Sequence, residues 1–241
     1  MQAVQSSPDP VARDAFSLRH ADLQAAIVDL DGTMVDTLGD FCAALDRMLA
    51  DLVLPAIPAA AVLDMVGKGS EHLIRSVLAH VGADAALYDQ AWARYQHHYP
   101  AVNGRHSRVY PGVVEGLRAL QARGLALACL TNKPTAFARA LLQAKGLDGF
   151  FSQVFGGDAF ARKKPDPLPL LATCQALGSQ PARTLMLGDS SNDAQAARAA
   201  GCPVVLVTYG YNHGQPVREV DADAWVDALD AAAALLPARG L

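Results

Sequence analysis

Short apolar runs alternate along the chain with segments whose apolar positions recur at helical spacing. Runs that read as buried strands, the last of them shorter and weaker, cover residues 25–30, 125–130, 184–188, 203–207 and 153–155. Helical patterns between them cover residues 113–123, 136–145 and 193–200. Apolar strands that alternate with helices are typical of a parallel sheet covered on both faces. The pattern therefore predicts an α/β fold with a doubly wound parallel sheet.

One segment interrupts this alternation. Between Asp36 and Tyr110, helical patterns follow one another without a convincing strand, at residues 38–49, 59–65, 71–80 and 85–98. A βαβ unit needs about 30 residues, so a segment more than twice that length predicts an inserted all-α subdomain. The insert follows directly after the first strand, and ligands of doubly wound sheets bind at the carboxyl ends of strands. We expect it to cover the active site as a cap.

These patterns predict a domain organisation. We expect a core domain over residues 21–36 and 109–241, a helical cap over 37–108 and a flexible N-terminal extension over 1–20. The extension carries prolines and charges without an apolar stretch, so we do not interpret it as a signal peptide. No apolar run approaches the ~18 residues that span a bilayer. We expect a cytoplasmic protein without a membrane partner.

Composition narrows the function classes. The chain has 241 residues, of which 51% are hydrophobic and 18% charged, which excludes a disordered chain. Its net charge of −4 argues against a general nucleic-acid binder but leaves an anionic substrate open, because a single lysine can dominate a cleft. The four cysteines form no CxxC pair and favour reduced thiols in a reducing compartment. The histidines show no zinc-site spacing.

Three of the predicted strands end in a polar residue able to do chemistry: Asp29, Thr131 and Asp189. The first is followed at once by Asp31 and a glycine, which lets the backbone turn so that both carboxylates can serve one centre. Asp-Gly is also a common turn dipeptide, so this motif alone leaves a simple capped turn open.

Four motifs follow in a fixed order: Asp-Leu-Asp-Gly-Thr at 29–33, Leu-Thr-Asn at 130–132, Lys-Pro at 164–165 and Gly-Asp-Ser-Ser-Asn-Asp at 188–193. Together they resemble the haloacid dehalogenase-like superfamily of phosphotransferases, over about residues 24–236. The resemblance implies that the helical insert is that family's α-helical type of cap.

Three longer segments are similar to bacterial phosphoglycolate phosphatases: residues 29–37, 163–170 and 208–214. The last, Thr-Tyr-Gly-Tyr-Asn-His-Gly, is the most particular, because the chemistry does not require it. This resemblance implies hydrolysis of 2-phosphoglycolate, a small anionic phosphomonoester.

The superfamily resemblance also implies roles for individual residues. Asp29 is expected to be the nucleophile that forms an aspartyl-phosphate, and Asp31 the acid and base. Mg²⁺ is expected to bind the carboxylates of Asp29 and Asp189 and the main-chain carbonyl of Asp31. Thr131 with its neighbouring amides, Asn132 among them, is expected to hold the phosphoryl oxygens.

Charge arithmetic supports a metal and selects an acid. Asp29, Asp31, Asp189 and Asp193 oppose a phosphate dianion, and Lys164, expected to neutralise the phosphoryl group and orient Asp29, returns one positive charge. A divalent cation is therefore required, and Mg²⁺ suits carboxylate ligands. A proton on Asp31 would then bring the pocket to neutrality, which favours Asp31 as the acid.

Two further residues carry weaker expectations. Asp193 is expected to cap a helix or to support the site from behind rather than to bind the metal directly. The segment from Val66 to Ser70 resembles the family's substrate-specificity loop. Lys68 there either binds a substrate carboxylate or is an exposed lysine in a glycine-rich link, and both interpretations stay open.

The expected function is that of a Mg²⁺-dependent phosphatase acting on a small acidic phosphomonoester. A second aspartate argues against a dehalogenase, because a halide leaving group needs no proton. A β-phosphoglucomutase-like phosphotransferase and a non-catalytic sensor of a phosphometabolite remain alternatives. Nothing in the sequence fixes the oligomeric state.

Overall fold

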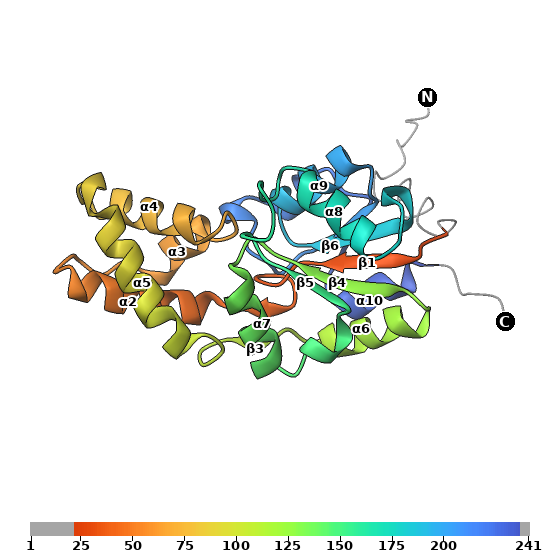
Figure 1. The fold of residues 1–241 in the computed structure, drawn as a ribbon, viewed down its shortest axis with the longest axis horizontal. Coiled ribbons are helices and arrows are strands. Elements are labelled where there is room, and N and C mark those ends of the chain that lie inside the picture. The colour runs from red at the N-terminus through yellow and green to blue at the C-terminus, as the bar shows by residue number, and fades with distance from the viewer. Residues whose placement is uncertain (1–21, 237–241) are drawn as a thin grey trace, which may run out of the picture.

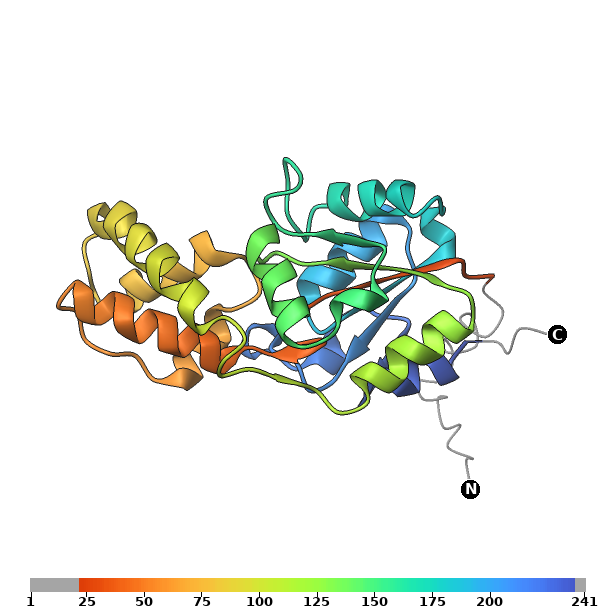
Figure 2. The ribbon, with the colours of Figure 1, turned by 60° about the horizontal axis from the view of Figure 1, so that its bottom comes forward.

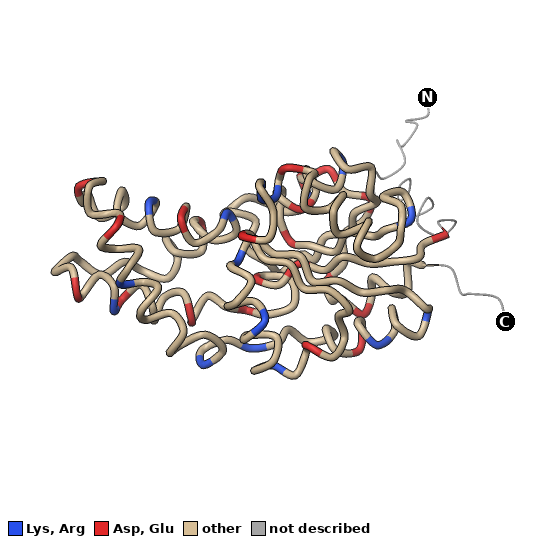
Figure 3. The backbone as a smooth tube through the Cα atoms, viewed as in Figure 1, with Lys and Arg blue, Asp and Glu red and all other residues tan. Residues whose placement is uncertain are grey.

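The computed structural model describes residues 22–236, so the expected extension over 1–20 lies outside the described residues. Figure 1 shows an elongated molecule with a sheet-containing lobe and a purely helical lobe. Figure 3 shows that acidic and basic residues are mixed over both lobes.

A six-stranded parallel sheet forms the centre of the larger lobe, in the order β5-β4-β1-β6-β7-β8. Its strands are β1 (Ala25–Val28), β4 (Ala126–Leu130), β5 (Gln153–Phe155), β6 (Thr184–Gly188), β7 (Val204–Val207) and β8 (Ala224–Val226). The chain leaves the central β1 toward β4 and β5 and then returns to the other side through β6. The sheet therefore has a topological switch point at β1, where such folds place their ligands.

Helices cover both faces of the sheet, as Figure 1 shows. One face packs against α6 (Val113–Ala122), α7 (Thr135–Ala144) and α10 (Leu229–Ala234), and the other against α8 (Leu168–Ala176) and α9 (Ser191–Ala200). The strands are apolar on both sides because both faces are buried. This arrangement confirms the predicted α/β doubly wound fold.

The register of the strands sets the position of the polar residues that follow them. Val28 pairs with Cys129 of β4 and with Leu187 of β6, so these three strands end at one level. Asp29, the first residue after β1, donates its N–H to the carbonyl of Leu187. The side chains after β1, β4 and β6 are thereby brought to one edge of the sheet.

The helical lobe consists of α2 (Leu38–Asp51), α3 (Ala59–Met65), α4 (Ser70–His80) and α5 (Tyr88–Val102), called the cap below. These helices bury an apolar cluster of their own, with Phe41 of α2 and Tyr99 of α5 at its edge toward the core. The predicted helix over 85–98 is a 3₁₀ turn followed by α5. The 3₁₀ turns of the described residues are η1 (Ala85–Leu87), η2 (Asp148–Phe150), η3 (Pro181–Arg183), η4 (Asn212–Gly214) and η5 (Val217–Glu219).

Two short strands connect the lobes. In β2 (Val35–Asp36) and β3 (Arg108–Val109) the chain enters and leaves the cap as an antiparallel pair, which runs between the lobes in Figure 2. The sequence pattern predicted no strand here, since two residues show no periodicity. It also missed β8, α8 and α10, which are short or contain proline.

All four cysteines are free. Cys129 is fully buried in β4, whereas Cys174 of α8 and Cys202 place their Sγ atoms 3.9 Å apart in the core, a proximity that 28 residues of sequence separation conceal. Among the residues that the structure describes, no helix combines the length and apolarity needed to cross a membrane.

Candidate active site

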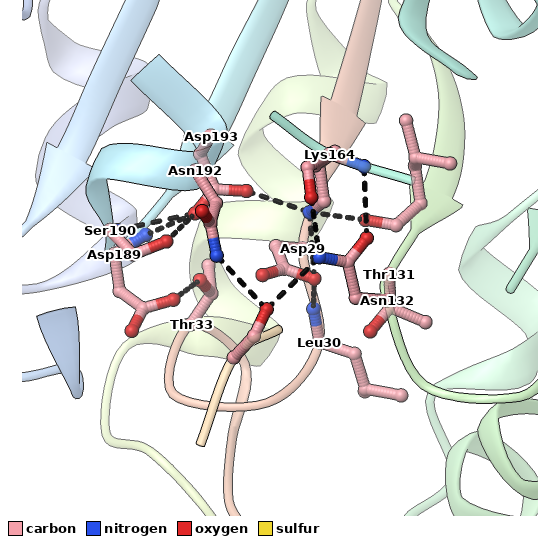
Figure 4. Close-up of polar contacts among 12 residues, drawn as sticks. Asp29, Leu30, Thr33, Thr131, Asn132, Lys164, Asp189, Ser190, Asn192 and Asp193 are labelled. Carbon is pink, nitrogen blue, oxygen red and sulfur yellow. Dashed lines mark hydrogen bonds and ion pairs between the residues drawn. The ribbon is translucent and has the colours of Figure 1, made fainter. Parts of the chain in front are cut away.

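Asp29 and Lys164 form the centre of a buried polar cluster at the carboxyl edge of the sheet (Figure 4). Asp29 Oδ1 accepts a hydrogen bond from the N–H of Leu30 at 2.7 Å and lies 3.1 Å from Lys164 Nζ. Burial raises the pKa of Asp29 to about 7, and the ammonium of Lys164 opposes that rise. Without a further cation, this carboxylate is only partly ionised at neutral pH.

The ammonium of Lys164 has a full set of acceptors. Besides Asp29, Nζ donates to the carbonyl of Leu130 at 2.9 Å and to Asp193 Oδ1 at 2.7 Å, and the side chain is 2% exposed. Burial acts to lower the pKa of Lys164, but the carboxylates of Asp193 and Asp29 outweigh it and raise the pKa above its usual value. Lys164 therefore stays charged beside Asp29.

Asp193 uses both carboxylate oxygens within the protein. Oδ1 accepts from Lys164, and Oδ2 accepts from Ser190 Oγ at 2.8 Å and from the N–H groups of Ser190 and Asp189 at 3.2 and 3.3 Å. Ser190 and Asp193 form a capping box at the start of α9. Asp193 thus couples the helix terminus to the ammonium beside Asp29.

Asp189 lies opposite Lys164 and contacts two motifs far apart in sequence. Its Oδ1 accepts from Thr33 Oγ1 at 2.8 Å, and its Oδ2 accepts from the N–H of Tyr211 at 2.7 Å. A Cβ at Gly210 would lie 2.1 Å from Asp189 Cβ, and one at Gly32, where φ is +83°, only 2.4 Å from Oδ2. This packing explains a glycine in the Tyr-Gly-Tyr segment. Burial raises the pKa of Asp189 well above its usual range.

Asp31 has a partner that the sequence analysis missed. Its Oδ1 accepts from Thr37 Oγ1 at 2.7 Å and from Lys133 Nζ at 2.8 Å. The side chain of Lys133 is 2% exposed and lies under the rings of Phe41 and Tyr99, 4.5 and 5.0 Å from their centroids. In the sequence, Lys133 is simply a lysine that precedes a proline at the start of a helix. The one sign of a role in the site was its position directly after Thr131 and Asn132.

Lys133 corrects the charge arithmetic. The pocket holds two ammonium groups against the four carboxylates, so a divalent cation brings it to neutrality without a proton on Asp31. The arithmetic therefore no longer selects Asp31 as the acid, and its assignment rests on position and on resemblance.

The model of the haloacid dehalogenase-like hydrolases matches residues 23–201. The chain belongs to this family. The hydrolase is 45% identical over 217 residues to a phosphoglycolate phosphatase of Thiobacillus denitrificans, covering 89% of this chain and 96% of the relative. A plasmid phosphoglycolate phosphatase of Cupriavidus necator is also 45% identical, over 218 residues that cover 89% and 94%. A crystal structure of a predicted phosphoglycolate phosphatase from Haemophilus somnus has a TM-score of 0.85 at 32% identity, over 88% and 97% of the chains.

A pocket between cap and core adjoins the cluster. Its lining combines core and cap residues: Asp29, Asp31, Phe41, Val66, Gly67, Gly69, Ser70, Leu73, Thr131, Asn132 and Lys133. Thr131 thus lies in the pocket, as does Asp29. Lys68 is exposed and absent from the lining, although the glycines on both sides of it are present. The structure does not bring Lys68 to the position expected of a carboxylate-binding residue.

The side chain of Asn132 connects two loops of the hydrolase. Its Nδ2 donates to the carbonyls of Gly67 in the cap and Lys164 in the core, and its Oδ1 accepts from the N–H of Lys164. Asn192 Nδ2 donates to the same Gly67 carbonyl at 3.1 Å. Two core amides therefore attach the loop between α3 and α4 to the sheet edge, and the side chain of Asn132 is engaged within the protein.

The donor set fits a hard divalent cation. Carboxylate oxygens of Asp29, Asp189 and Asp193 lie within 4.8 Å of one another. Asp29 Oδ1 receives the bonds from Leu30 and Lys164 and leaves Oδ2 available, whereas Asp189 and Asp193 accept bonds on both oxygens. Asp189 accepts one bond on each oxygen, while Asp193 Oδ2 alone accepts three, so Asp189 keeps more acceptor capacity for a cation. Burial makes ionisation of Asp29 and Asp189 unfavourable, as both raised pKa values show. A cation bound by these oxygens would relieve that cost.

Proposed function

We propose that this hydrolase is a Mg²⁺-dependent phosphatase that converts 2-phosphoglycolate to glycolate and phosphate. The observation that carries the chemistry is the buried Asp29 carboxylate, 3.1 Å from the Lys164 ammonium and open to the pocket. The choice of 2-phosphoglycolate as substrate rests on the names of the relatives, which are 45% identical over 89% of this chain. The pocket is lined by both the core and the cap, so the ester would lie between the two lobes.

In this proposal Asp29 is the nucleophile. Its Oδ2 attacks phosphorus, the bond between phosphorus and the ester oxygen breaks, and an aspartyl-phosphate forms. Asp31 gives a proton to the leaving glycolate oxygen and then takes one from the water that hydrolyses the intermediate. Thr131 and the backbone amides after it hold the phosphoryl oxygens, and Lys164 offsets their charge.

Three residues would hold Mg²⁺ in the proposed site: Asp29 and Asp189 through carboxylates and Asp31 through its main-chain carbonyl. The bound ion would supply positive charge to the phosphoryl oxygens. Asp193 would support the site in two ways. It accepts a hydrogen bond from Lys164, and at the start of α9 it accepts one from the N–H of Asp189. We further propose the core as residues 21–36 and 109–241 and the cap as 37–108. The four reduced cysteines suit the cytoplasm.

The test measures phosphate released from 2-phosphoglycolate, with and without Mg²⁺, by the wild type, Asp29→Asn and Asp46→Asn. Asp46 is exposed on α2 and receives the same substitution as a matched control. We expect Mg²⁺-dependent release by the wild type and the control and background release by Asp29→Asn. Substantial release by Asp29→Asn would refute the nucleophile. Isomerised sugar phosphate without matching free phosphate would indicate a mutase, and binding without release a sensor.

A further inference from the structure

Lys133 is a buried ammonium with unused hydrogen-bonding capacity. A lysine ammonium has three donors. Within residues 22–236, Asp31 is the one hydrogen-bond acceptor of Lys133 Nζ, whereas Lys164 Nζ has three oxygens around it. The rings of Phe41 and Tyr99 stabilise the charge of Lys133 but accept no conventional hydrogen bond. Lys133 can therefore bind a second anionic group.

Lys133 is part of the lining of the pocket between cap and core. Lys133 lines the same pocket as Asp29 and Thr131, and it is the one basic side chain in that lining. The cap side of the lining includes Gly69 and Ser70, where α4 begins, besides Phe41, Val66, Gly67 and Leu73. The N-cap residue Gly69 supplies no side-chain cap to this 11-residue helix, whose positive end therefore lies beside the pocket. The one acidic side chain of its first turn, Glu71, is paired with Lys163.

We infer that Lys133, together with the N-terminus of α4, binds the carboxylate of the substrate and so determines its specificity. The inference rests on the proposed function, because it takes the phosphoryl group to lie at Asp29 and Thr131. In 2-phosphoglycolate one methylene separates the ester oxygen from the carboxylate, so both anionic ends fit one small pocket. One core loop then binds both ends of the substrate, the phosphoryl group through Thr131 and the carboxylate through Lys133. The exposed Lys68 has no such contact with the pocket.

Binding of the carboxylate is coupled to Asp31. The substrate carboxylate and Asp31 share one ammonium, so the incoming group weakens the Lys133–Asp31 pair of 2.8 Å. A phosphomonoester without a carboxylate leaves that pair intact. Neutralising Asp31 relieves repulsion of the phosphoryl group in both esters and in addition frees Lys133. Binding of 2-phosphoglycolate should therefore gain more than binding of an ester without a carboxylate.

The first experiment compares Lys133→Met with Lys68→Met on 2-phosphoglycolate and on 2-hydroxyethyl phosphate, which has a hydroxymethyl group in place of the carboxylate. Since a hydrogen bond between charged groups is lost, Lys133→Met should lower the ratio of the two kcat/KM values about 10- to 100-fold. Lys68→Met should leave this ratio unchanged. Equal losses on both substrates in Lys133→Met would overturn the inference and make Lys133 a positioning residue for Asp31. A ratio that collapses in Lys68→Met instead would overturn it as well.

The second experiment avoids an unpaired buried charge. Calorimetric titrations in Mg²⁺ compare both esters on variants that also carry Asp29→Asn, so that no substrate is consumed. These are Asp29→Asn itself, Asp29→Asn/Asp31→Asn and the triple variant that adds Lys133→Met, in which both partners are neutral. Adding Asp31→Asn should strengthen binding of 2-phosphoglycolate more than binding of 2-hydroxyethyl phosphate, and the triple variant should lose the preference for the carboxylate. A preference that the triple variant retains refutes the role of Lys133 and leaves the proposed substrate standing. No preference in Asp29→Asn itself refutes this inference and the proposed substrate together.

Discussion

The hydroxyl of Tyr211 joins the catalytic edge of the core to the start of the cap. It accepts hydrogen bonds from the N–H groups of Thr37 and Leu38, at 2.6 and 3.0 Å, and it donates to Asp36 Oδ1 at 3.1 Å. Burial raises the pKa of Tyr211 far above its usual value, so the hydroxyl keeps its proton. Replacing Tyr211 by Phe removes this single oxygen and retains the ring.

The cost of Tyr211→Phe comes mainly from Thr37. Thr37 is fully buried, so water cannot replace the lost acceptor, and an unsatisfied buried N–H costs about 1–3 kcal/mol. Leu38 is partly exposed and keeps a longer contact of 3.4 Å with Asp36 Oδ1, so its loss adds about 0.5 kcal/mol. We expect the free energy of unfolding to fall by about 1.5–3.5 kcal/mol.

Urea unfolding of the metal-free protein measures this difference, and Tyr209→Phe is the matched control. The Tyr209 hydroxyl makes one hydrogen bond, to the carbonyl of Thr33 at 2.7 Å, so we expect a loss of about 1 kcal/mol. For a protein of this size each kcal/mol lowers Tm by about 2–4 °C, which gives a second readout. If Tyr211→Phe costs no more than Tyr209→Phe, the assignment of the hydroxyl as the acceptor for the cap is refuted.

Three further predictions concern the aspartates. Asp193→Asn leaves Lys164 with one carboxylate partner and places an amide among donors, so it should cost about 3 kcal/mol in urea unfolding; a loss below about 1 kcal/mol would contradict the buried ion pair. Because burial raises the pKa of Asp29 to about 7, protons compete with Mg²⁺ at lower pH, and the Kd for Mg²⁺ in calorimetry should rise about tenfold from pH 8 to pH 6. A constant Kd over that range would contradict it. In Gly210→Ala the new Cβ would overlap Asp189 and displace its carboxylate, so the Kd for Mg²⁺ should rise about 10-fold or more. An unchanged Kd would show that Asp189 is not a ligand.

The fold and the meeting of the motifs were predictable from the sequence, for a physical reason. Strands buried on both faces must be apolar, so β1, β4, β6 and β7 stand out, and their parallel pairing brings the residues after them to one edge. The helical insert was equally visible, because each of its helices has an apolar face. The short strands β2, β3 and β8 carry no periodicity and were missed, whereas β5, also of three residues, was predicted as a weak apolar run.

The two lysines show which contacts the sequence could not indicate. Lys133 looked like an ordinary residue before a helix, because what makes it special is burial under Phe41 and Tyr99, which lie in other helices. For Lys68 the sequence left two interpretations open, a carboxylate ligand or an exposed lysine, because the flanking glycines allow the loop to bend. The loop does approach the pocket, but the carbonyl of Gly67 is held by Asn132 and Asn192, and the lysine side chain is exposed. Such contacts between distant segments leave no local pattern.

The pairing of β2 with β3 has a consequence for how this architecture can be altered. Asp36 lies opposite Arg108, so the two points at which the chain leaves the sheet-containing lobe are neighbours in one ladder. A turn of two residues suffices to join such antiparallel partners. The whole helical lobe can therefore be exchanged as a cassette, for a short turn or for an unrelated helical module, without changing the register of the strands that carry the aspartates. Substrate range could then diversify, by design or in evolution, through exchange of one contiguous segment.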